Sequence, residues 1–223
     1  MTKQNIVPMD KFFNKVSEKY DEERETTLPS YPSLYIEFSK HIKSTDEPVE
    51  VLDLGVGTGL ELSWIFGKMP NAKITCIDLS EKMLEKLKIK YHKFASQITI
   101  IQGSYLDNNF SNRKFDYIFS FMTFHHLLRD DKLNLYKNIA GALKAKGVFI
   151  EGDTIVQTKA EEDEKYANYL ELKEANNIKN SWDYHIDIPL CKKTQAELYE
   201  QAGFQKSDII YDKNRAVMYI CTL

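Results

Sequence analysis

The chain has 223 residues, of which 43% are hydrophobic and 12% aromatic, and a net charge of −3 at pH 7. This length is typical of one domain with an extension, and the apolar content is sufficient for a large core, which excludes an intrinsically disordered chain. The weakly acidic balance excludes the diffuse positive field with which most non-specific nucleic-acid-binding proteins hold their partner, although it leaves room for a local basic patch.

No segment predicts export or membrane insertion. The N-terminus lacks the apolar stretch of a signal peptide, and the longest nearly apolar run, residues 117–124, is too short to cross a bilayer. The three cysteines, Cys76, Cys191 and Cys221, are widely spaced and form no Cys-x-x-Cys pair. We therefore expect a soluble cytoplasmic protein with reduced thiols, no metal centre and no membrane partner.

The first predicted element is a helix within residues 11–32, which ends in the turn-prone sequence LPSYPS. Short β-branched or aromatic runs then predict five strands, at residues 49–54, 73–78, 97–102, 115–121 and 147–151. Helical patterns lie between them at residues 58–67, 80–95 and 130–143, with Ser80 as a helix N-cap. This alternation predicts a parallel sheet covered on both faces, because each parallel connection needs a crossover.

The last part of the chain has a different pattern. A helix over residues 194–202 is closed by Gly203, and the runs 207–211 and 216–222 flank a short polar turn, which is the spacing of a hairpin. We expect an α/β fold: a Rossmann-like, doubly wound, mostly parallel seven-stranded sheet with a C-terminal antiparallel hairpin edge.

Two segments fall outside this core. Residues 1–48 are expected to form an N-terminal helical lid in front of the single domain 49–223. A charged helix over residues 158–176 lies within a cover insertion at about 154–190, and it holds three lysines against six acidic residues. The acidity of the chain is therefore local.

A glycine-rich loop follows the first strand in the sequence VLDLGVGTG. Gly55, Gly57 and Gly59 lie between a strand and a helix, where the absence of a Cβ lets the backbone approach a ligand closely. Leu60 stands where a dinucleotide fingerprint has its third glycine, and no Gly-Lys-Ser/Thr follows as in a Walker A loop. Both departures argue against a phosphate-binding loop.

Two acidic residues accompany this loop. Asp53, inside the first strand, suits an ammonium group or helps to hold the loop. Asp78 ends the second strand, at the position from which a carboxylate accepts both hydroxyls of a ribose. Together with the glycines they predict a pocket for a nucleoside that carries an amino acid in place of a phosphate.

With these residues, VLDLGVGTG, CIDLSEKML and FDYIFSFMTFHHL resemble the first, second and fourth motifs of the class I S-adenosylmethionine (SAM) dependent methyltransferases. The resemblance extends from about residue 20 to the C-terminus, and it implies SAM as the cofactor. In place of an acidic residue that often meets the adenine amino group in this family, the chain has Ser104. The residues that the resemblance implies around SAM are Tyr20, Asp53, Gly55, Gly57, Gly59, Asp78, Leu79, Met83, Gly103, Ser104, Tyr105 and Ser120.

Methyl transfer from a sulfonium is an in-line displacement, so the protein has to align donor and acceptor and exclude water. An acceptor that must lose a proton needs a base, and His125 and His126, after the fourth strand, are the candidates; each could equally pack under the loop. The candidate contacts to the acceptor are Arg24, Tyr31, Tyr35, Asp153, Trp182 and Tyr184.

The sequence thus predicts a methyltransferase that acts on a small molecule. One alternative is a tRNA-modifying enzyme similar to the carboxy-SAM synthases, which would need a cation near the sulfonium, such as Arg215, Lys192 or Lys193. A nicotinamide-dependent oxidoreductase and a non-catalytic SAM-binding module are further alternatives. Nucleic acid is the less favoured partner, and the sequence identifies neither the acceptor atom nor the oligomeric state.

Overall fold

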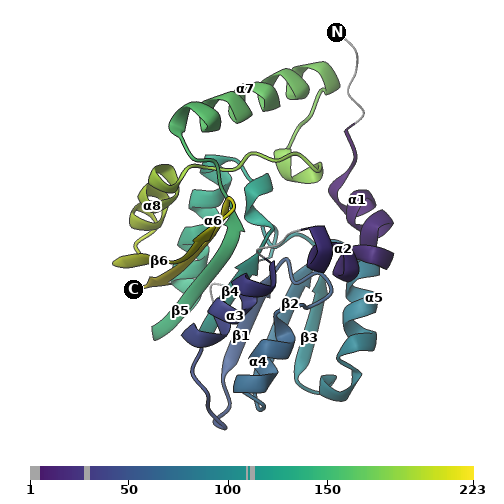
Figure 1. The fold of residues 1–223 in the computed structure, drawn as a ribbon, viewed down its shortest axis with the longest axis vertical. Helices are drawn as coiled ribbons and strands as arrows, with labels where there is room; N and C mark the ends of the chain where they lie inside the picture. The colour runs from purple at the N-terminus through teal and green to yellow at the C-terminus, as the bar shows by residue number, and fades with distance from the viewer. Residues whose placement is uncertain (1–5, 28–30, 109, 111–113) are drawn as a thin grey trace.

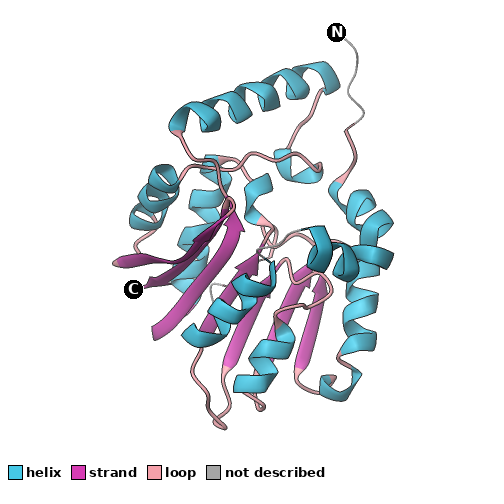
Figure 2. Ribbon diagram, in the orientation of Figure 1, coloured by secondary structure: helices cyan, strands magenta, loops and turns pink. Residues whose placement is uncertain are grey.

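A seven-stranded sheet forms the centre of the computed structural model, which describes residues 6–27, 31–108, 110 and 114–223 (Figures 1 and 2). The strand order is β3-β2-β1-β4-β5-β7-β6. All pairs among the first five strands are parallel, whereas β7 runs antiparallel to both β5 and β6. The strands are β1 (Glu50–Leu54), β2 (Lys73–Asp78), β3 (Ile98–Gln102), β4 (Phe115–Phe121), β5 (Leu143–Thr154), β6 (Lys206–Lys213) and β7 (Ala216–Thr222). The predicted fold, including its hairpin edge, is confirmed.

Helices cover both faces of this sheet. The first face carries α3 (Tyr31–His41), α4 (Leu62–Lys68) and α5 (Glu81–Lys90), whose apolar side chains join one core cluster. The second face carries α6 (Arg129–Ala142) and α8 (Lys192–Gln201), which join a second cluster. Because both faces are buried, the central strands are apolar along almost their whole length, as in VLDL of β1.

The strand order reverses between β1 and β4. From β1 the chain proceeds outward to β2 and β3, and from β4 it proceeds in the opposite direction to β5. The loops that follow β1 and β4 therefore separate at the carboxyl edge of the sheet. Open α/β sheets bind their ligands in the crevice at such a switch point.

Two groups of elements lie beyond the carboxyl ends of the strands (Figure 1). The first is the N-terminal cover, residues 9–27, with α1 (Met9–Val16), the 3-10 turn η1 (Ser17–Lys19) and α2 (Tyr20–Thr27). The second is the C-terminal cover, residues 158–190, with α7 (Lys159–Asn176) and the turn η4 (Ser181–Asp183). Thr158 caps α7 by accepting a hydrogen bond from Glu161. None of the helices described is long and apolar enough to cross a membrane.

Several element boundaries differ from those predicted. The helix expected from residue 58 begins at Leu62, because the glycine loop continues through a turn up to Glu61. The strand expected at residues 147–151 extends over Leu143–Thr154. The predicted helix 80–95 is divided into α5 and the turn η2 (His92–Phe94), and Ser80 is its N-cap as expected.

Helix α3 was not predicted. The sequence LPSYPS indicated a turn, and its first three residues lie outside the described ones. Pro32 nevertheless occupies the first turn of α3, where its missing N–H has no intrahelical acceptor to lose. Leu34, Phe38 and Ile42 then follow at helical spacing and are buried against the sheet.

Candidate functional site

A cavity opens at the switch point, between the carboxyl edge of the sheet and the two covers. Residues from the sheet edge, from the N-terminal cover and from the C-terminal cover all contribute to its wall. Ten of the residues expected at the site line it: Tyr20, Gly55, Gly57, Asp78, Leu79, Met83, Ser104, Tyr105, His126 and Trp182. The remaining lining residues are Met9, Phe13, Leu106, Phe121, Met122, Thr123 and Leu127.

The glycine loop forms one wall of the cavity. Gly55 has φ +77°, and a Cβ at this position would lie 2.6 Å from the Thr123 hydroxyl oxygen. A side chain at Gly55 would therefore push the loop after β1 away from the loop after β4. Gly59 is different, because it packs against Leu62 and Tyr91 and its carbonyl accepts a hydrogen bond from the Tyr91 hydroxyl (2.6 Å).

Asp78 is fixed by the backbone around it. Its Oδ2 accepts a hydrogen bond from the Gly57 N–H and its Oδ1 accepts one from the Ser80 N–H, both at 2.8 Å. Burial raises the pKa of Asp78, and these two N–H groups oppose that effect. A carboxylate oxygen can accept two hydrogen bonds, so Asp78 keeps acceptor capacity toward the cavity that it lines.

Asp53 lies behind the glycine loop, outside the cavity wall. It is 1% exposed and faces Glu61, which is 3% exposed. Burial and the carboxylate of Glu61 raise the pKa of Asp53, and burial raises the pKa of Glu61 to about 7. Apart from Glu61, no N–H or O–H group among the described residues donates to either carboxylate oxygen of Asp53. A cation bound at this loop would therefore stabilise the ionised pair.

Polar contacts fix the N-terminal cover to the loop and to α5. Asp21 accepts a hydrogen bond from the Thr58 hydroxyl (2.5 Å) and forms an ion pair with Lys90 (2.6 Å). The Arg24 guanidinium lies over the Tyr20 ring, 4.9 Å from its centroid. Asp21 therefore joins α2 both to the glycine loop and to α5.

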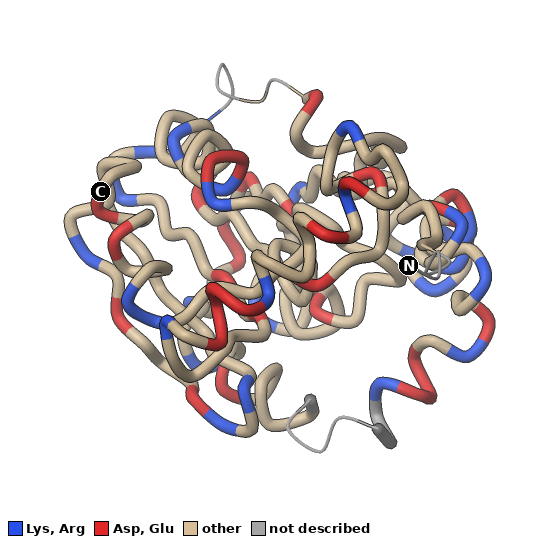
Figure 3. The backbone as a smooth tube through the Cα atoms, turned by 90° about the horizontal axis from the view of Figure 1, so that it is seen from above, with Lys and Arg blue, Asp and Glu red and all other residues tan. Residues whose placement is uncertain are grey.

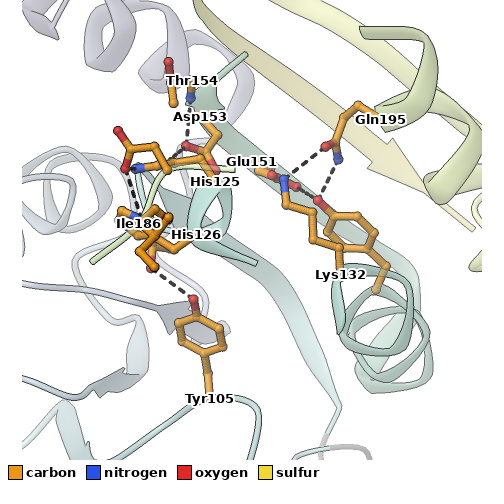
Figure 4. A network of polar contacts seen from close by, with 12 residues as sticks. Tyr105, His125, His126, Lys132, Glu151, Asp153, Thr154, Ile186 and Gln195 are labelled. Atoms are coloured by element: carbon orange, nitrogen blue, oxygen red, sulfur yellow. Dashed lines mark hydrogen bonds and ion pairs between the residues drawn. The ribbon is translucent and has the colours of Figure 1, made fainter. Parts of the chain in front are cut away.

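Two adjacent histidines follow β4 in the turn η3 (Phe124–His126) (Figure 4). His125 Nδ1 lies 2.6 Å from Asp153 Oδ1, and His126 Nδ1 lies 3.1 Å from the Ile186 carbonyl oxygen and 3.2 Å from Asp187 Oδ1. Both imidazoles are buried, and only His126 lines the cavity. Burial, together with the charge of His125, lowers the pKa of His126 to about 4 despite the carboxylate of Asp187.

Asp153 does not line the cavity, although it was expected to contact the acceptor. Its Oδ1 faces His125 and also accepts a hydrogen bond from the Thr154 N–H (2.7 Å). Burial alone would raise the pKa of Asp153, but the charge and hydrogen bond of His125 outweigh it and the pKa is lowered. Asp153 thus orients His125 and is not part of the acceptor surface.

A second polar network lies next to Asp153 (Figure 4). Glu151 Oε2 accepts hydrogen bonds from the hydroxyls of Tyr136 and Tyr199, each at 2.7 Å. Lys132 is 1% exposed and donates to Gln195 (3.3 Å). Burial raises the pKa of Glu151 to about 7, although the ammonium group of Lys132 opposes the shift.

The other expected residues lie away from the cavity wall. Tyr35 is buried against Phe121 and its hydroxyl donates to Glu61, and Tyr184 pairs with Pro8 through the backbone. The Gly103 N–H donates to the Asp78 carbonyl, and the Ser120 hydroxyl is buried without a partner among the described residues. The side chain of Tyr31 is outside the described part of the chain.

Some residues that line the cavity, or that contact a lining residue, were not found from the sequence. Phe13 belongs to an amphipathic helix whose apolar side chains looked like ordinary core, and Asp187 lies in a sequence with no recognisable motif. Met122 has φ +55°, a strained backbone conformation for a non-glycine residue that often occurs at functional sites. Its N–H donates to the Gly152 carbonyl (2.8 Å), which fixes this bend at the edge of the cavity.

The cations considered for a carboxylated cofactor are remote from this cavity. Lys192 pairs with Asp212, Arg215 pairs with Glu161, and Lys193 is exposed. Among the described residues, no Lys or Arg lines the cavity. Figure 3 also shows basic and acidic positions interspersed along the chain in that view.

Comparisons with known proteins identify a methyltransferase domain. A family model described as a methyltransferase domain matches residues 51–147. A carboxy-S-adenosyl-L-methionine synthase from Nautilia profundicola is 24% identical over 235 residues, covering 95% of this chain and 98% of that protein. A malonyl-[acyl-carrier protein] O-methyltransferase from Bacillus cytotoxicus is 26% identical over 220 residues, covering 92% and 67%.

The fold is shared with solved structures. The DhpI-SAM-HEP complex superposes with a TM-score of 0.67 at 15% identity, over 96% of this chain and 95% of that one. The matched region contains the glycine loop, Asp78 and the paired histidines. Residues 51–147 therefore form a class I SAM-dependent methyltransferase domain, and the protein uses SAM as its cofactor.

Proposed function

We propose that this protein transfers the methyl group of SAM to a small-molecule acceptor bound in the same cavity. The observation that carries the proposal is the composition of the cavity wall. It combines the glycine loop and Asp78 with the uncharged side chains of Phe13 and Trp182 and with His126. A ligand with a nucleoside at one side and an apolar or weakly polar acceptor at the other suits such a wall.

The residues proposed to hold SAM are those whose chemistry matches the parts of SAM. Asp78 has acceptor capacity for the ribose hydroxyls, while Leu79 and Met83 offer an apolar surface to the adenine. Both carboxylate oxygens of Asp53 are buried without a hydrogen-bond partner among the described residues, and the ammonium group of the methionine part would supply a positive charge for them. When bound, SAM supplies an electrophilic methyl group on a sulfonium.

The chain's own contribution is to align the acceptor and to exclude water. Phe13 comes from the N-terminal cover and Trp182 from the C-terminal cover, so the two covers together enclose the cavity. We assign His126, and His125 behind it, to the acceptor side, because His126 is the ionisable group after β4 that reaches the wall. In this reading the N-terminal cover, residues 9–27, is a lid that belongs functionally to the domain 49–223. Of the lid predicted over residues 1–48, α3 instead packs on the sheet as part of the core.

The alternative is a carboxy-SAM synthase, the activity named for the relative from Nautilia profundicola. A carboxylate attached to the cofactor would need a cation, and none of the described lining residues is Lys or Arg. Arg24 is not a lining residue either, and its guanidinium lies over the ring of Tyr20. Methyl transfer to a small molecule is therefore the better supported function.

The proposed partner is thus a small molecule. Nucleic acid is disfavoured because no Lys or Arg among the described residues lines the cavity and because basic and acidic positions are interspersed along the chain (Figure 3). We also infer a cytoplasmic location, supported by three free cysteines that are buried as thiols.

A binding comparison tests the proposal. Isothermal titration calorimetry of the purified protein is expected to give tighter binding of SAM than of carboxy-SAM. A panel of small alcohols, amines, thiols and carboxylic acids is then incubated with SAM, and mass spectrometry follows S-adenosylhomocysteine (SAH) and the methylated product. Carboxy-SAM binding ten-fold more tightly than SAM, with no acceptor methylated, would overturn the proposal.

A further inference from the structure

We propose that His125, His126 and Asp187 bind one divalent transition-metal ion beside the cavity. Each residue offers one ligand atom, and these atoms all lie within 4.8 Å of one another. Two imidazoles and one carboxylate form the ligand set of many zinc sites that retain an open coordination position. His126 also lines the cavity, so the ion would lie at its edge.

The separations between the ligand atoms fit a single ion. A tetrahedral site with metal–ligand distances of about 2.0–2.1 Å places its ligand atoms about 3.3 Å apart. Asp187 Oδ1 lies 3.2 Å from His126 Nδ1 and 3.7 Å from His125 Nε2. The side chain of Asp187 is 52% exposed, so it has room to rotate toward both imidazoles.

The groups behind the ligands are those that such a site requires. A metal-bound imidazole normally donates its other N–H to a carboxylate, which fixes the ring and its tautomer. Asp153 Oδ1 lies 2.6 Å from His125 Nδ1, so His125 Nε2 is left to face Asp187. Asp153 is itself fixed by the Thr154 N–H. This arrangement explains why a buried aspartate is present here without contacting the cavity.

A fourth ligand is also at hand. The Ile186 carbonyl oxygen lies 3.1 Å from His126 Nδ1, on the same segment as Asp187. Without an ion, the His126 Nδ1–H donates a hydrogen bond to the Ile186 carbonyl oxygen. A bound ion would replace the proton on Nδ1. Nitrogen ligands favour Zn²⁺ and its transition-metal neighbours over Mg²⁺ or Ca²⁺, which prefer oxygen.

The two carboxylates around His125 also favour a bound cation. Asp153 and Asp187 place two carboxylates on opposite sides of His125, and a divalent cation would balance both. The ion would join the turn after β4 to the C-terminal cover, whose residues are about 60 positions away in the chain. With an ion bound, His126 would be a metal ligand and would not be free to act as the base predicted from the sequence. The prediction that the protein has no metal centre would then also be wrong.

Metal binding to the protein without SAM tests the inference independently of methyl transfer. After dialysis against EDTA, titration with Zn²⁺ is expected to give one ion per chain and a raised melting temperature, and Co²⁺ is expected to give a visible d–d absorption band. Mg²⁺ serves as the control ion. Asp187→Asn should abolish the Co²⁺ band, and Asp153→Asn should weaken Zn²⁺ binding about 10- to 100-fold.

Asp183→Asn is the matched control, because Asp183 is an exposed carboxylate on the same cover that pairs with Asn180. It should leave metal binding unchanged. The exposed position of Asp187 means that its asparagine variant is expected to fold. Failure of the wild-type protein to bind Zn²⁺ or Co²⁺, or equal binding by Asp187→Asn, would overturn the inference and leave a hydrogen-bonded histidine–aspartate cluster only.

Discussion

Asp78 shows how one carboxylate can both organise a loop and remain available to a ligand. Its two oxygens accept the N–H groups of Gly57 and Ser80, so the glycine loop and the start of α5 are positioned by the side chain that lines the cavity. The sequence predicted Asp78 only as an acceptor for ribose hydroxyls, so its two backbone contacts are a finding of the structure.

Asp78→Asn is expected to weaken SAM binding by about 10- to 100-fold. The variant replaces one acceptor oxygen by a donor group, and hydrogen bonds to a charged group contribute about 1.5–3 kcal/mol. Isothermal titration calorimetry measures the effect. Asp107→Asn, an exposed carboxylate on the loop after β3, should bind SAM as the wild type does. Equal affinities for Asp78→Asn and the wild type would remove Asp78 from the site.

Glu61 predicts a pH dependence of stability. Its pKa rises from 4.5 to about 7 on folding because it is buried. Between these values the folded protein binds more protons than the unfolded chain, so the free energy of unfolding contributed by this group falls as pH rises. The loss is about 3 kcal/mol over the interval, from about 1.4 kcal/mol per pH unit.

Glu61→Gln should remove this contribution, since the amide does not ionise. Urea unfolding at pH 5 and pH 8 is expected to show a smaller loss of stability for Glu61→Gln than for the wild type. Glu151 has a similarly raised pKa but is present in both proteins, so it does not affect the difference. If the wild type and Glu61→Gln lose the same stability between pH 5 and pH 8, Glu61 is ionised at neutral pH in the folded state.

Other residue roles could not be predicted, because they arise from tertiary contacts. Asp187 becomes important only where the C-terminal cover meets His126, and Phe13 only where α1 reaches the cavity. Asp153 was assigned to the acceptor from its position after a strand, yet its partner is His125. Position along the chain does not determine which neighbour a side chain selects.

Among the elements, α5 and α7 were predictable because their signals are local. Ser80 and Thr158 accept the hydrogen bonds of N-caps, and each helix has an apolar pattern or a charge pattern of its own. Helix α3 carries conflicting signals, since Pro32 suggests a turn while burial of Phe38 against Phe119 and Phe121 favours a helix. Packing on the sheet decides the outcome.

The N-terminal cover depends on Asp21, which contacts Thr58 of the glycine loop and Lys90 of α5. Asp21→Ala is expected to loosen residues 9–27 and to weaken SAM binding about 3- to 10-fold, because partly exposed ion pairs and hydrogen bonds contribute about 1 kcal/mol each. Hydrogen–deuterium exchange of α1 and α2 should increase together with the dissociation constant of SAM.

Glu18→Gln is the control for this variant. Glu18 is exposed, and only its backbone carbonyl oxygen accepts the hydrogen bond from Lys86. This substitution should change neither exchange nor binding. Faster exchange of α1 and α2 in Asp21→Ala at an unchanged SAM affinity would show that the cover does not act as a lid.

For the whole molecule, the alternation of strand and helix patterns was enough to predict the sheet and its hairpin edge, because right-handed crossovers leave few other topologies. It did not predict where the two covers lie, since they follow no such rule. Their positions depend on single contacts such as that of Asp21 with Lys90, and on the packing of Phe12 against His185, which joins the two covers.

Ligand binding should therefore stabilise the molecule as one unit. The cavity is lined by the sheet edge and by both covers, so we expect SAH to bind the form in which all three are in place. At a concentration 100 times its dissociation constant, a ligand adds about 2.7 kcal/mol to the free energy of unfolding. For a chain of this length each kcal/mol corresponds to about 2–4 °C, so SAH should raise the melting temperature by about 5 to 11 °C in a single transition. NADH at the same concentration should leave the melting temperature unchanged, because Leu60 replaces the third glycine of a dinucleotide loop. Two separate transitions, of which SAH shifts only the later one, would instead mean that the covers fold independently of the sheet and do not help to bind the cofactor.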